Sequence, residues 1–178
     1  MQMDQIVTQQ VIDTDRFVLR PLRKSDKGMI EMYAGQDRLA RMTTSIPHPL
    51  PPGVTEAFIQ RSHEPDRTED VWALDGTAMG AAEVMGIISL DRLDRNQSEV
   101  GYWVAPPFWN TGVAQTALEA LLRANPLQSN TIFASVFQDN PASARVLIKC
   151  GFEYLGDAED FSVSRNATVP TWTYSKSL

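Results

Sequence analysis

The residues best placed to do chemistry lie between Glu99 and Ala124, and their order indicates a site for a phosphate group. Glu99 to Val104 is rich in β-branched and aromatic residues and predicts a strand, which Pro106 and Pro107 must end because proline cannot donate to a ladder. Apolar residues then recur at helical spacing from Gly112 to Ala124. The N–H groups that open this helix lack intrahelical partners, and together with the positive end of the helix dipole they can bind a phosphate or pyrophosphate.

Two common phosphate loops are excluded, because the sequence has neither Gly-x-x-x-x-Gly-Lys-Ser/Thr nor Gly-x-Gly-x-x-Gly. The segment Trp109-Asn110-Thr111-Gly112-Val113-Ala114 instead resembles the Gln/Arg-x-x-Gly-x-Gly/Ala pyrophosphate loop of the GCN5-related N-acetyltransferase (GNAT) family, in the Trp-containing form of its RimJ and RimL branch. Trp109 stands where the family usually has a basic or amide side chain, so this position lacks the usual phosphate ligand.

Two further segments strengthen the resemblance. Asn140-Pro141-Ala142-Ser143, followed by Lys149-Cys150-Gly151-Phe152, resembles the Asn-x-x-Ser/Ala…Lys-x-Gly-Phe segment of the same family. The stretch 15–21, Asp-Arg-Phe-Val-Leu-Arg-Pro, is similar to the usual opening strand of the branch. The resemblance therefore covers most of the chain.

The resemblance implies transfer of an acetyl group from acetyl-coenzyme A (acetyl-CoA), the cosubstrate, directly to an amine. In that fold the strands at 99–104 and 131–137 splay apart, and the pantetheine lies between them and bonds their backbone. The residues expected to bind the cofactor are Trp103, Val104, Ala105, Trp109, Asn110, Thr111, Gly112, Val113, Ala114, Asn140 and Ser143.

Glu99 and Ser143 are the candidate catalytic residues. Glu99 matches a glutamate that part of the family uses as a base, and the reaction needs one because the amine must be neutral to attack. A solvated carboxylate at a strand end would show the same pattern. Many members protonate the departing thiolate with a tyrosine, but the matching position is Leu147. Ser143 lies one turn earlier on the same helix face, where it can bond the sulfur, the pantetheine or its own helix backbone.

Other reactive side chains have simpler expected roles. Asn140 is expected both to cap the helix that starts at Pro141 and to contact the cofactor. Cys150 lies among apolar residues at the helix end, which favours packing over a thioester-forming role. His48 and His63 are expected on the surface, with a place in the acceptor cleft as the alternative.

The fold class is α/β (α+β), and the GNAT resemblance implies a mixed central sheet of about six to seven strands with splayed parallel central strands, flanked by about four helices. Residues 1–178 suit a single domain, with 1–12 as a loosely ordered extension. The expected strands are 16–22, 71–74, 84–90, 99–104, 131–137, 152–155 and 171–175. The expected helices follow a cap at Ser25 or Asp26, follow a cap at Thr55, and start at 112 and at 141. Gly86 suggests a bulge.

Composition narrows the functional class. The net charge of −6 disfavours nucleic-acid binding and favours a cationic partner. One cysteine and two distant histidines predict no metal site. The sequence shows no signal peptide and no membrane-spanning run, so a cytoplasmic protein is expected, as a monomer or homodimer.

Three functions stay open at this point. The first is acetylation of a protein N-terminal amine; the second is acetylation of a small molecule such as an antibiotic, polyamine or amino acid. The third is a non-catalytic acyl-CoA sensor, which the missing tyrosine would suit. The sequence does not name the acceptor, because the proline-rich loop 46–53 and the segment 54–65 are where related enzymes differ.

Overall fold

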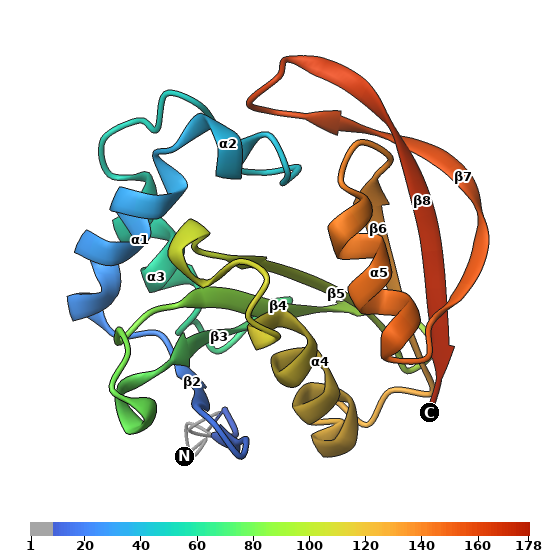
Figure 1. Ribbon diagram of the computed structural model, residues 1–178, viewed down its shortest axis with the longest axis horizontal. Helices are drawn as coiled ribbons and strands as arrows, with labels where there is room; N and C mark the ends of the chain where they lie inside the picture. The colour runs from blue at the N-terminus through green and yellow to red at the C-terminus, as the bar shows by residue number, and fades with distance from the viewer. Residues whose placement is uncertain (1–8) are drawn as a thin grey trace, which may run out of the picture.

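A mixed sheet in the order β1-β2-β3-β4-β5-β6-β8-β7 forms the centre of the computed structural model, which describes residues 9–178 (Figure 1). The strands are Ile12–Asp13 (β1), Val18–Pro21 (β2), Glu69–Asp75 (β3), Gly86–Leu93 (β4), Gln97–Val104 (β5), Thr131–Phe137 (β6), Glu153–Ser162 (β7) and Ala167–Ser177 (β8). The helices are Lys27–Ala34 (α1), Asp37–Ala40 (α2), Val54–Arg61 (α3), Val113–Ala124 (α4) and Pro141–Lys149 (α5). This arrangement confirms the predicted fold class.

The sheet has eight strands, one more than the upper expected number, because β1 is added at its edge. The sequence predicted a loose extension over residues 1–12. Residues 1–8 lie outside the described part of the chain, whereas Ile12 pairs with Leu19 and is 5% exposed. The main-chain oxygen of Gln10 accepts a hydrogen bond of 2.7 Å from Trp72 Nε1. A two-residue strand is too short to give a periodic pattern, so the sequence did not reveal it.

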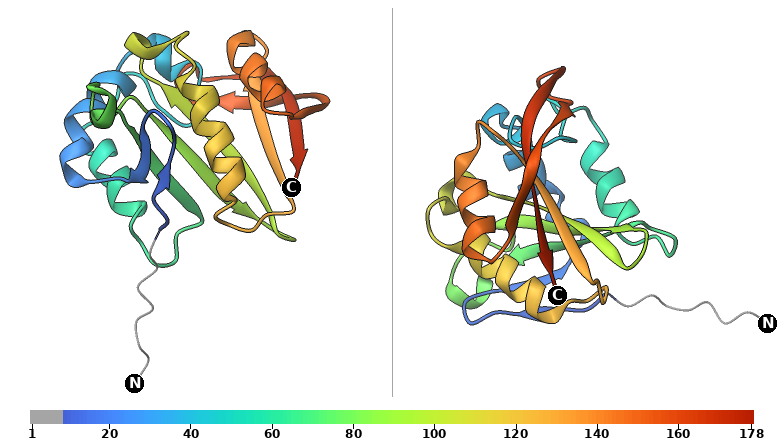
Figure 2. Two further views of the ribbon diagram at one scale, coloured as in Figure 1. Left: turned by 60° about the horizontal axis from the view of Figure 1, so that its bottom comes forward. Right: turned by 90° about the vertical axis from the view of Figure 1, so that its right-hand side faces the viewer.

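Helices lie on both faces of the sheet (Figure 2), and alternate residues of its strands pack against them. In β3, Trp72 and Leu74 belong to the larger core, which contains the apolar side of α4 and α5. Their neighbours Val71 and Ala73 point to the other face, where they pack with residues of α1 and α3. This period of two follows from the pleat of a strand. One face of the sheet is therefore covered by α4 and α5 and the other by α1 and α3.

The two central strands diverge, as the resemblance implied. β5 and β6 run parallel but pair only from Gln97–Glu99 to Thr131–Phe133, although both strands continue for four residues or more beyond that contact. β5 stays paired with β4 along its whole length, and β6 stays paired with β8. A V-shaped gap thus opens inside the sheet above Glu99.

The register between β3 and β4 shifts by one residue at Gly86, where the sequence predicted a bulge. The pairs up to Ala73 with Ile87 keep one register, whereas the next bond, from Met85 N to Leu74 O over 2.8 Å, is displaced by one residue. A Cβ atom at Gly86 would lie 2.3 Å from the main-chain oxygen of Trp103, so the glycine permits a close approach of two backbones.

The last two strands form a hairpin much longer than predicted. It extends beyond the rest of the sheet, and in Figure 1 its tip reaches toward the loop after α2. At the tip Val163 N donates to Thr44 O over 3.0 Å, and Arg165 Nε donates to Arg41 O over 3.0 Å. Arg165 also forms a salt bridge with Asp139, beside the start of α5. The hairpin therefore bridges the two walls on either side of the gap.

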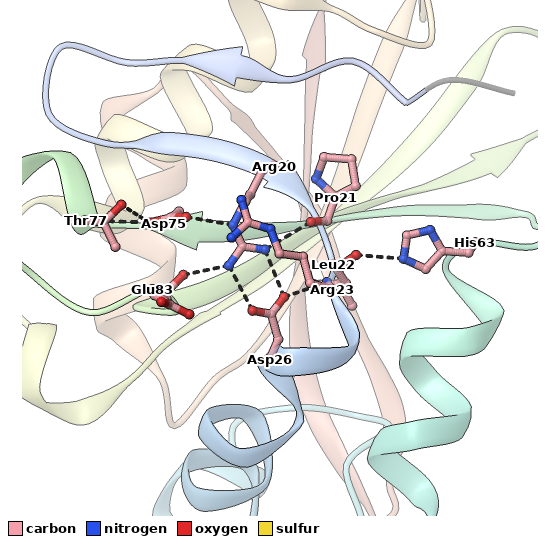
Figure 3. Close-up of polar contacts among 9 residues, drawn as sticks. All are labelled: Arg20, Pro21, Leu22, Arg23, Asp26, His63, Asp75, Thr77 and Glu83. Atoms are coloured by element: carbon pink, nitrogen blue, oxygen red, sulfur yellow. Dashed lines mark hydrogen bonds and ion pairs between the residues drawn. The ribbon is translucent and has the colours of Figure 1, made fainter.

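A buried arginine joins the opening strand to the rest of the sheet (Figure 3). Arg20 Nη2 donates to Asp26 Oδ1 over 2.8 Å, and Arg20 Nε donates to Asp75 Oδ2 over 2.7 Å. Its guanidinium also donates to the main-chain oxygen of Glu83. The bond to Asp26 is the main reason why the pKa of Arg20 is raised. The network fixes β2, the start of α1 and the end of β3 relative to one another.

Candidate active site

A cavity of about 970 Å³ opens at the gap between β5 and β6. Ten of the eleven residues predicted to bind the cofactor line it, and so does Glu99. Ala105 is the exception. It is fully buried, and its N–H donates to Met85 O over 2.8 Å, so this N–H is not free to bond a ligand. The expectation that Ala105 contacts the cofactor is therefore wrong for its backbone N–H.

The backbone of β5 presents alternate residues to the gap. Because Ala105 N bonds to β4, the main-chain groups of Trp103 also face β4, while those of Tyr102 and Val104 face β6. β6 has already diverged there, so the Tyr102 and Val104 N–H groups point into the gap. Val104 O is taken by Trp109 Nε1, at 2.6 Å. Trp103 contributes its side chain to the cavity rather than its amide.

The turn before α4 has the geometry of an anion site. Gly112 is the N-cap residue with φ of 78°, a left-handed conformation that a side chain would strain. No side chain caps this helix, and the first helical hydrogen bond in this turn runs from Thr116 N to Gly112 O. The N–H groups of Val113, Ala114 and Gln115 therefore stand open at the positive end of the helix dipole.

The side chain of Arg16, 95 positions earlier in the chain, reaches this turn, and the sequence did not predict this contact. Arg16 Nη1 donates to Thr111 O over 3.1 Å and would lie 3.5 Å from a Cβ atom at Gly112. Trp109, which occupies the usual basic position, packs instead against the core, with Arg38 over its ring at 5.4 Å. Arg16 thus supplies the charge that Trp109 cannot. In the sequence, Arg16 was noticeable only as part of segment 15–21, which is similar to the family's opening strand.

Glu99 lies at the point where β5 and β6 separate, and its side chain is exposed in the cavity. Desolvation by the surrounding cavity walls raises the pKa of Glu99, and the nearby carboxylates of Asp160 and Asp91 raise it further. A raised pKa brings a carboxylate closer to neutral pH and makes it a stronger base. Glu99 therefore lies in the cavity with a pKa above its ordinary value, and its role as the base stays a prediction.

Ser143 lies across the gap, in the first turn of α5, and is paired with a tyrosine that the sequence analysis did not consider. Ser143 Oγ donates to Tyr102 Oη over 3.0 Å, and Tyr102 Oη donates to Ser143 O over 3.1 Å. Burial raises the pKa of Tyr102 to about 12, so its hydroxyl stays protonated. Leu147, at the family's tyrosine position, is fully buried in the core. Ser143 lies four residues before Leu147 on α5, so the hydroxyl pair and Leu147 are on the same side of the helix.

Asn140 precedes α5 and lines the cavity, but it does not cap the helix through its side chain. Its φ of −122° and ψ of 66° leave the side chain without a cap hydrogen bond, so this part of the prediction is wrong. The helix begins at Pro141, whose missing N–H needs no partner. The Asn140 amide therefore stays available to a ligand.

The remaining candidates lie outside the reaction centre. Cys150 is 9% exposed and its Sγ donates to Gln115 O over 3.9 Å; burial raises the pKa of its thiol to about 11, which suits the packing role. His63 Nε2 contacts Leu22 O at 2.7 Å, outside the cavity (Figure 3). His48 is exposed and does not line the cavity either.

The fold, the V-shaped gap and the anion site together define an acyl-CoA-dependent transferase, and comparisons with known proteins identify the family. The model of the acetyltransferase (GNAT) domain family matches residues 16–153, more than half of the chain, so the chain belongs to this family. A relative from Bacillus subtilis (strain 168), described as the uncharacterized N-acetyltransferase YoaA, is 25% identical over 174 residues, covering 93% of this chain and 95% of the relative. The chain is thus an acetyl-CoA-dependent N-acetyltransferase.

Solved structures with different acceptors share the fold. RimL, a ribosomal L7/L12 alpha-N-protein acetyltransferase in complex with coenzyme A, matches with a TM-score of 0.79 at 15% identity, over 95% of this chain and 98% of that one. A spermidine N-acetyltransferase from Vibrio cholerae, in complex with coenzyme A and spermine, matches with a TM-score of 0.75 at 17% identity, over 91% and 95%. At these identities the likeness concerns the fold and does not determine the acceptor.

Two expected absences concern metals and membranes. Within residues 9–178 no three His, Cys, Asp or Glu side chains are grouped so that they could hold a metal ion. None of the helices in that range has the length and apolar character needed to cross a membrane.

Proposed function

We propose that the chain transfers the acetyl group of acetyl-CoA to a primary amine, in the first place the α-amine at the N-terminus of a protein. The observation that carries this proposal is the V-shaped gap, because it places open backbone N–H groups between an anion site at Gly112 and a carboxylate at Glu99. A pantetheine chain carries amides that can pair with such groups, and its pyrophosphate suits the N-terminus of α4. The β7–β8 hairpin joins the two walls of the gap, so an acceptor has to enter the cavity end first. This favours the terminus of a polypeptide chain as the acceptor.

Each step of the reaction has a group in the cavity. Glu99 accepts the proton of the ammonium group, directly or through water, and the neutral nitrogen attacks the carbonyl carbon of the thioester. The N–H groups of Tyr102 and Val104 face the gap and can stabilise the negative charge that develops on the carbonyl oxygen. The carbon–sulfur bond then breaks as the attacking nitrogen gives up its second proton to water. Ser143 Oγ, which in this structure donates to Tyr102 Oη, redirects that hydrogen bond to the departing thiolate. The leaving thiolate takes its proton from water.

Tyr102 Oη donates its own proton to the main-chain oxygen of Ser143 over 3.1 Å, so in this structure the phenol is not directed at the sulfur. We assign Tyr102 the role of holding Ser143 in place.

Substitution of Gly112 by glutamate tests the cofactor site. The new side chain places bulk and negative charge at the open N–H groups of α4, so acetyl-CoA binding measured by calorimetry should be lost. Gly112→Ala is the matched control for backbone strain, because alanine at φ of 78° carries the same conformational cost of about 1–2 kcal/mol without the charge. If folded Gly112→Glu binds acetyl-CoA as tightly as Gly112→Ala does, the cofactor lies elsewhere.

Turnover tests the transfer itself. The purified chain with acetyl-CoA should release free thiol in the presence of peptides that have an unblocked N-terminus, and N-terminally blocked versions should be inactive. Release with no peptide in such a panel, although acetyl-CoA binds, would contradict the assignment of the N-terminal amine.

A further inference from the structure

A row of three carboxylates lines the cavity on the face of the sheet that packs against α1 and α3. Glu69 in β3 lies directly opposite Asp91 in β4, and Asp91 lies directly opposite Glu99 in β5. Residues that are directly opposite point to the same face of a sheet, and their Cα atoms lie about 4.5–5.5 Å apart. All three line the cavity, so the row extends away from the reaction centre over about 10 Å.

A fourth carboxylate faces this row from the hairpin. Asp160 in β7 lines the same cavity and raises the pKa of Glu99 through its charge. Asp91 likewise raises the pKa of Glu69, after the larger effect of burial. Among residues 9–178 none of these four carboxylates forms a salt bridge. The positive charge of Arg61 in α3 lowers the pKa of Glu69, but the two side chains do not form an ion pair.

Like charges placed directly opposite one another destabilise a sheet. Two other acidic residues of this sheet are paired with arginines: Asp70 forms salt bridges with Arg67 and Arg92, and Asp75 forms one with Arg20. The unpaired row therefore costs folding free energy that its own strands do not recover. A cation that binds in the cavity would recover it.

A second, independent feature of the wall indicates a ligand with N–H groups. Thr171 in β8 is 1% exposed, and its Oγ1 has no hydrogen-bond partner among the described residues. It lines the same cavity and pairs with Ala158, two residues from Asp160 on β7, so the Thr171 and Asp160 side chains share one face. Diagonal neighbours of this kind lie about 7–8 Å apart. A buried hydroxyl without a partner is costly, and an ammonium group can satisfy it.

We propose that the acceptor amine carries a second positive charge, which the Glu69–Asp91–Asp160 carboxylates and Thr171 bind while Glu99 deprotonates the reacting amine. The second cation lies about 5–10 Å from the reacting nitrogen, as the spacing of the row dictates. The carboxylates are too widely spread to hold a metal ion, so an extended organic cation fits them. An aliphatic diamine has this chemistry, and so does a peptide whose N-terminal residue is followed by lysine.

This inference rests on the proposed function, and matched acceptors separate the two. The full chain is assayed for thiol release with diaminobutane against butylamine, and with the peptide Ala-Lys against Ala-norleucine, in which only the second ammonium is missing. The doubly charged member of at least one pair should have a kcat/KM about tenfold higher, as one favourable charge contact provides. The pair that shows the preference identifies the source of the cation.

Two variants and one control connect the preference to these residues. Glu69→Gln and Asp160→Asn should each reduce the preference to roughly a third or less, and added salt should reduce it in the wild type. Glu159→Gln removes a neighbouring carboxylate that is exposed and does not line the cavity, so it should leave the preference intact. Thermal denaturation of all three variants checks that they are folded.

The outcomes are distinct. Turnover of singly and doubly charged acceptors with equal kcat/KM would overturn this inference and leave the proposed function standing. A preference that survives both Glu69→Gln and Asp160→Asn would also overturn it. Acetylation of none of the four amines, by a chain that binds acetyl-CoA, would overturn the inference together with the proposed function.

Discussion

Replacing Glu99 by glutamine tests the catalytic mechanism most directly. Glutamine keeps the size and the hydrogen-bonding capacity of the side chain but cannot accept the amine proton. A positioned general base contributes roughly 10²–10⁴-fold to a rate. Glu99 is exposed in the cavity, so water can partly replace it, and we expect the lower end, a loss of roughly 10²-fold in kcat or about 2.7 kcal/mol. Acetyl-CoA affinity should be nearly unchanged, because the anion site is at Gly112.

The pH dependence of kcat/KM tests the assignment of Glu99 as the base more sharply. The base is active when ionised, so kcat/KM should fall as the pH drops through the pKa of Glu99, which is raised from its ordinary value. Since Asp160 contributes to that rise, Asp160→Asn should move this acid limb to lower pH, and Glu159→Gln should not move it. In Glu99→Gln the limb should vanish, and activity should recover partly at high pH, where more of the amine is already neutral.

The assay is continuous thiol release at saturating acetyl-CoA, from pH 5 to 10, with one acceptor throughout. Urea denaturation controls for unfolding. Removing a repelled charge from the carboxylate row should leave Glu99→Gln at least as stable as the wild type at neutral pH. A mutant profile that matches the wild type at every pH would refute the assignment of the base, and an acid limb unaffected by Asp160→Asn would refute its electrostatic explanation.

Three further predictions concern binding and stability. Arg16→Gln should weaken acetyl-CoA binding roughly three- to tenfold in calorimetry, with a smaller effect at high salt because the site is open to solvent; an unchanged Kd would remove Arg16 from the anion site. Asn140→Ala should weaken the same binding yet change the free energy of unfolding by less than about 0.5 kcal/mol, since no cap bond is lost; a cost near 1 kcal/mol would restore its capping role. Arg20→Met should cost about 3–5 kcal/mol in urea denaturation, because it leaves Asp26 and Asp75 buried without a counter-ion; a cost below 1 kcal/mol would show that water reaches them.

The parts of the site that depend on local sequence were predictable. Gly112 follows a strand that two prolines end and opens a helix with clear apolar spacing, so the anion site could be placed from neighbouring residues alone. The same holds for α5, which begins at Pro141 and ends just before Gly151. In both cases backbone chemistry at an element boundary fixes the conformation, whatever the rest of the chain does.

The parts that depend on tertiary contacts were not predictable. Arg16 reaches the loop at Thr111 from 95 positions away, and Tyr102 meets Ser143 across the gap. Asp160 belongs to a strand whose residues are mostly exposed, so it lacks the alternation of apolar and polar residues by which strands are recognised. Asp160 and Glu99 are brought to one cavity only by the way the long hairpin folds over the sheet.

The divergence of β5 and β6 also has a consequence for handling the protein. Beyond Glu99 and Phe133 each strand has one open edge inside the sheet, and open edges attract other extended chains. A pantetheine chain bound between the two strands would cover these open edges and so prevent them from pairing with other extended chains. Preparations kept with coenzyme A should therefore stay dispersed at concentrations and temperatures at which the bare protein begins to self-associate.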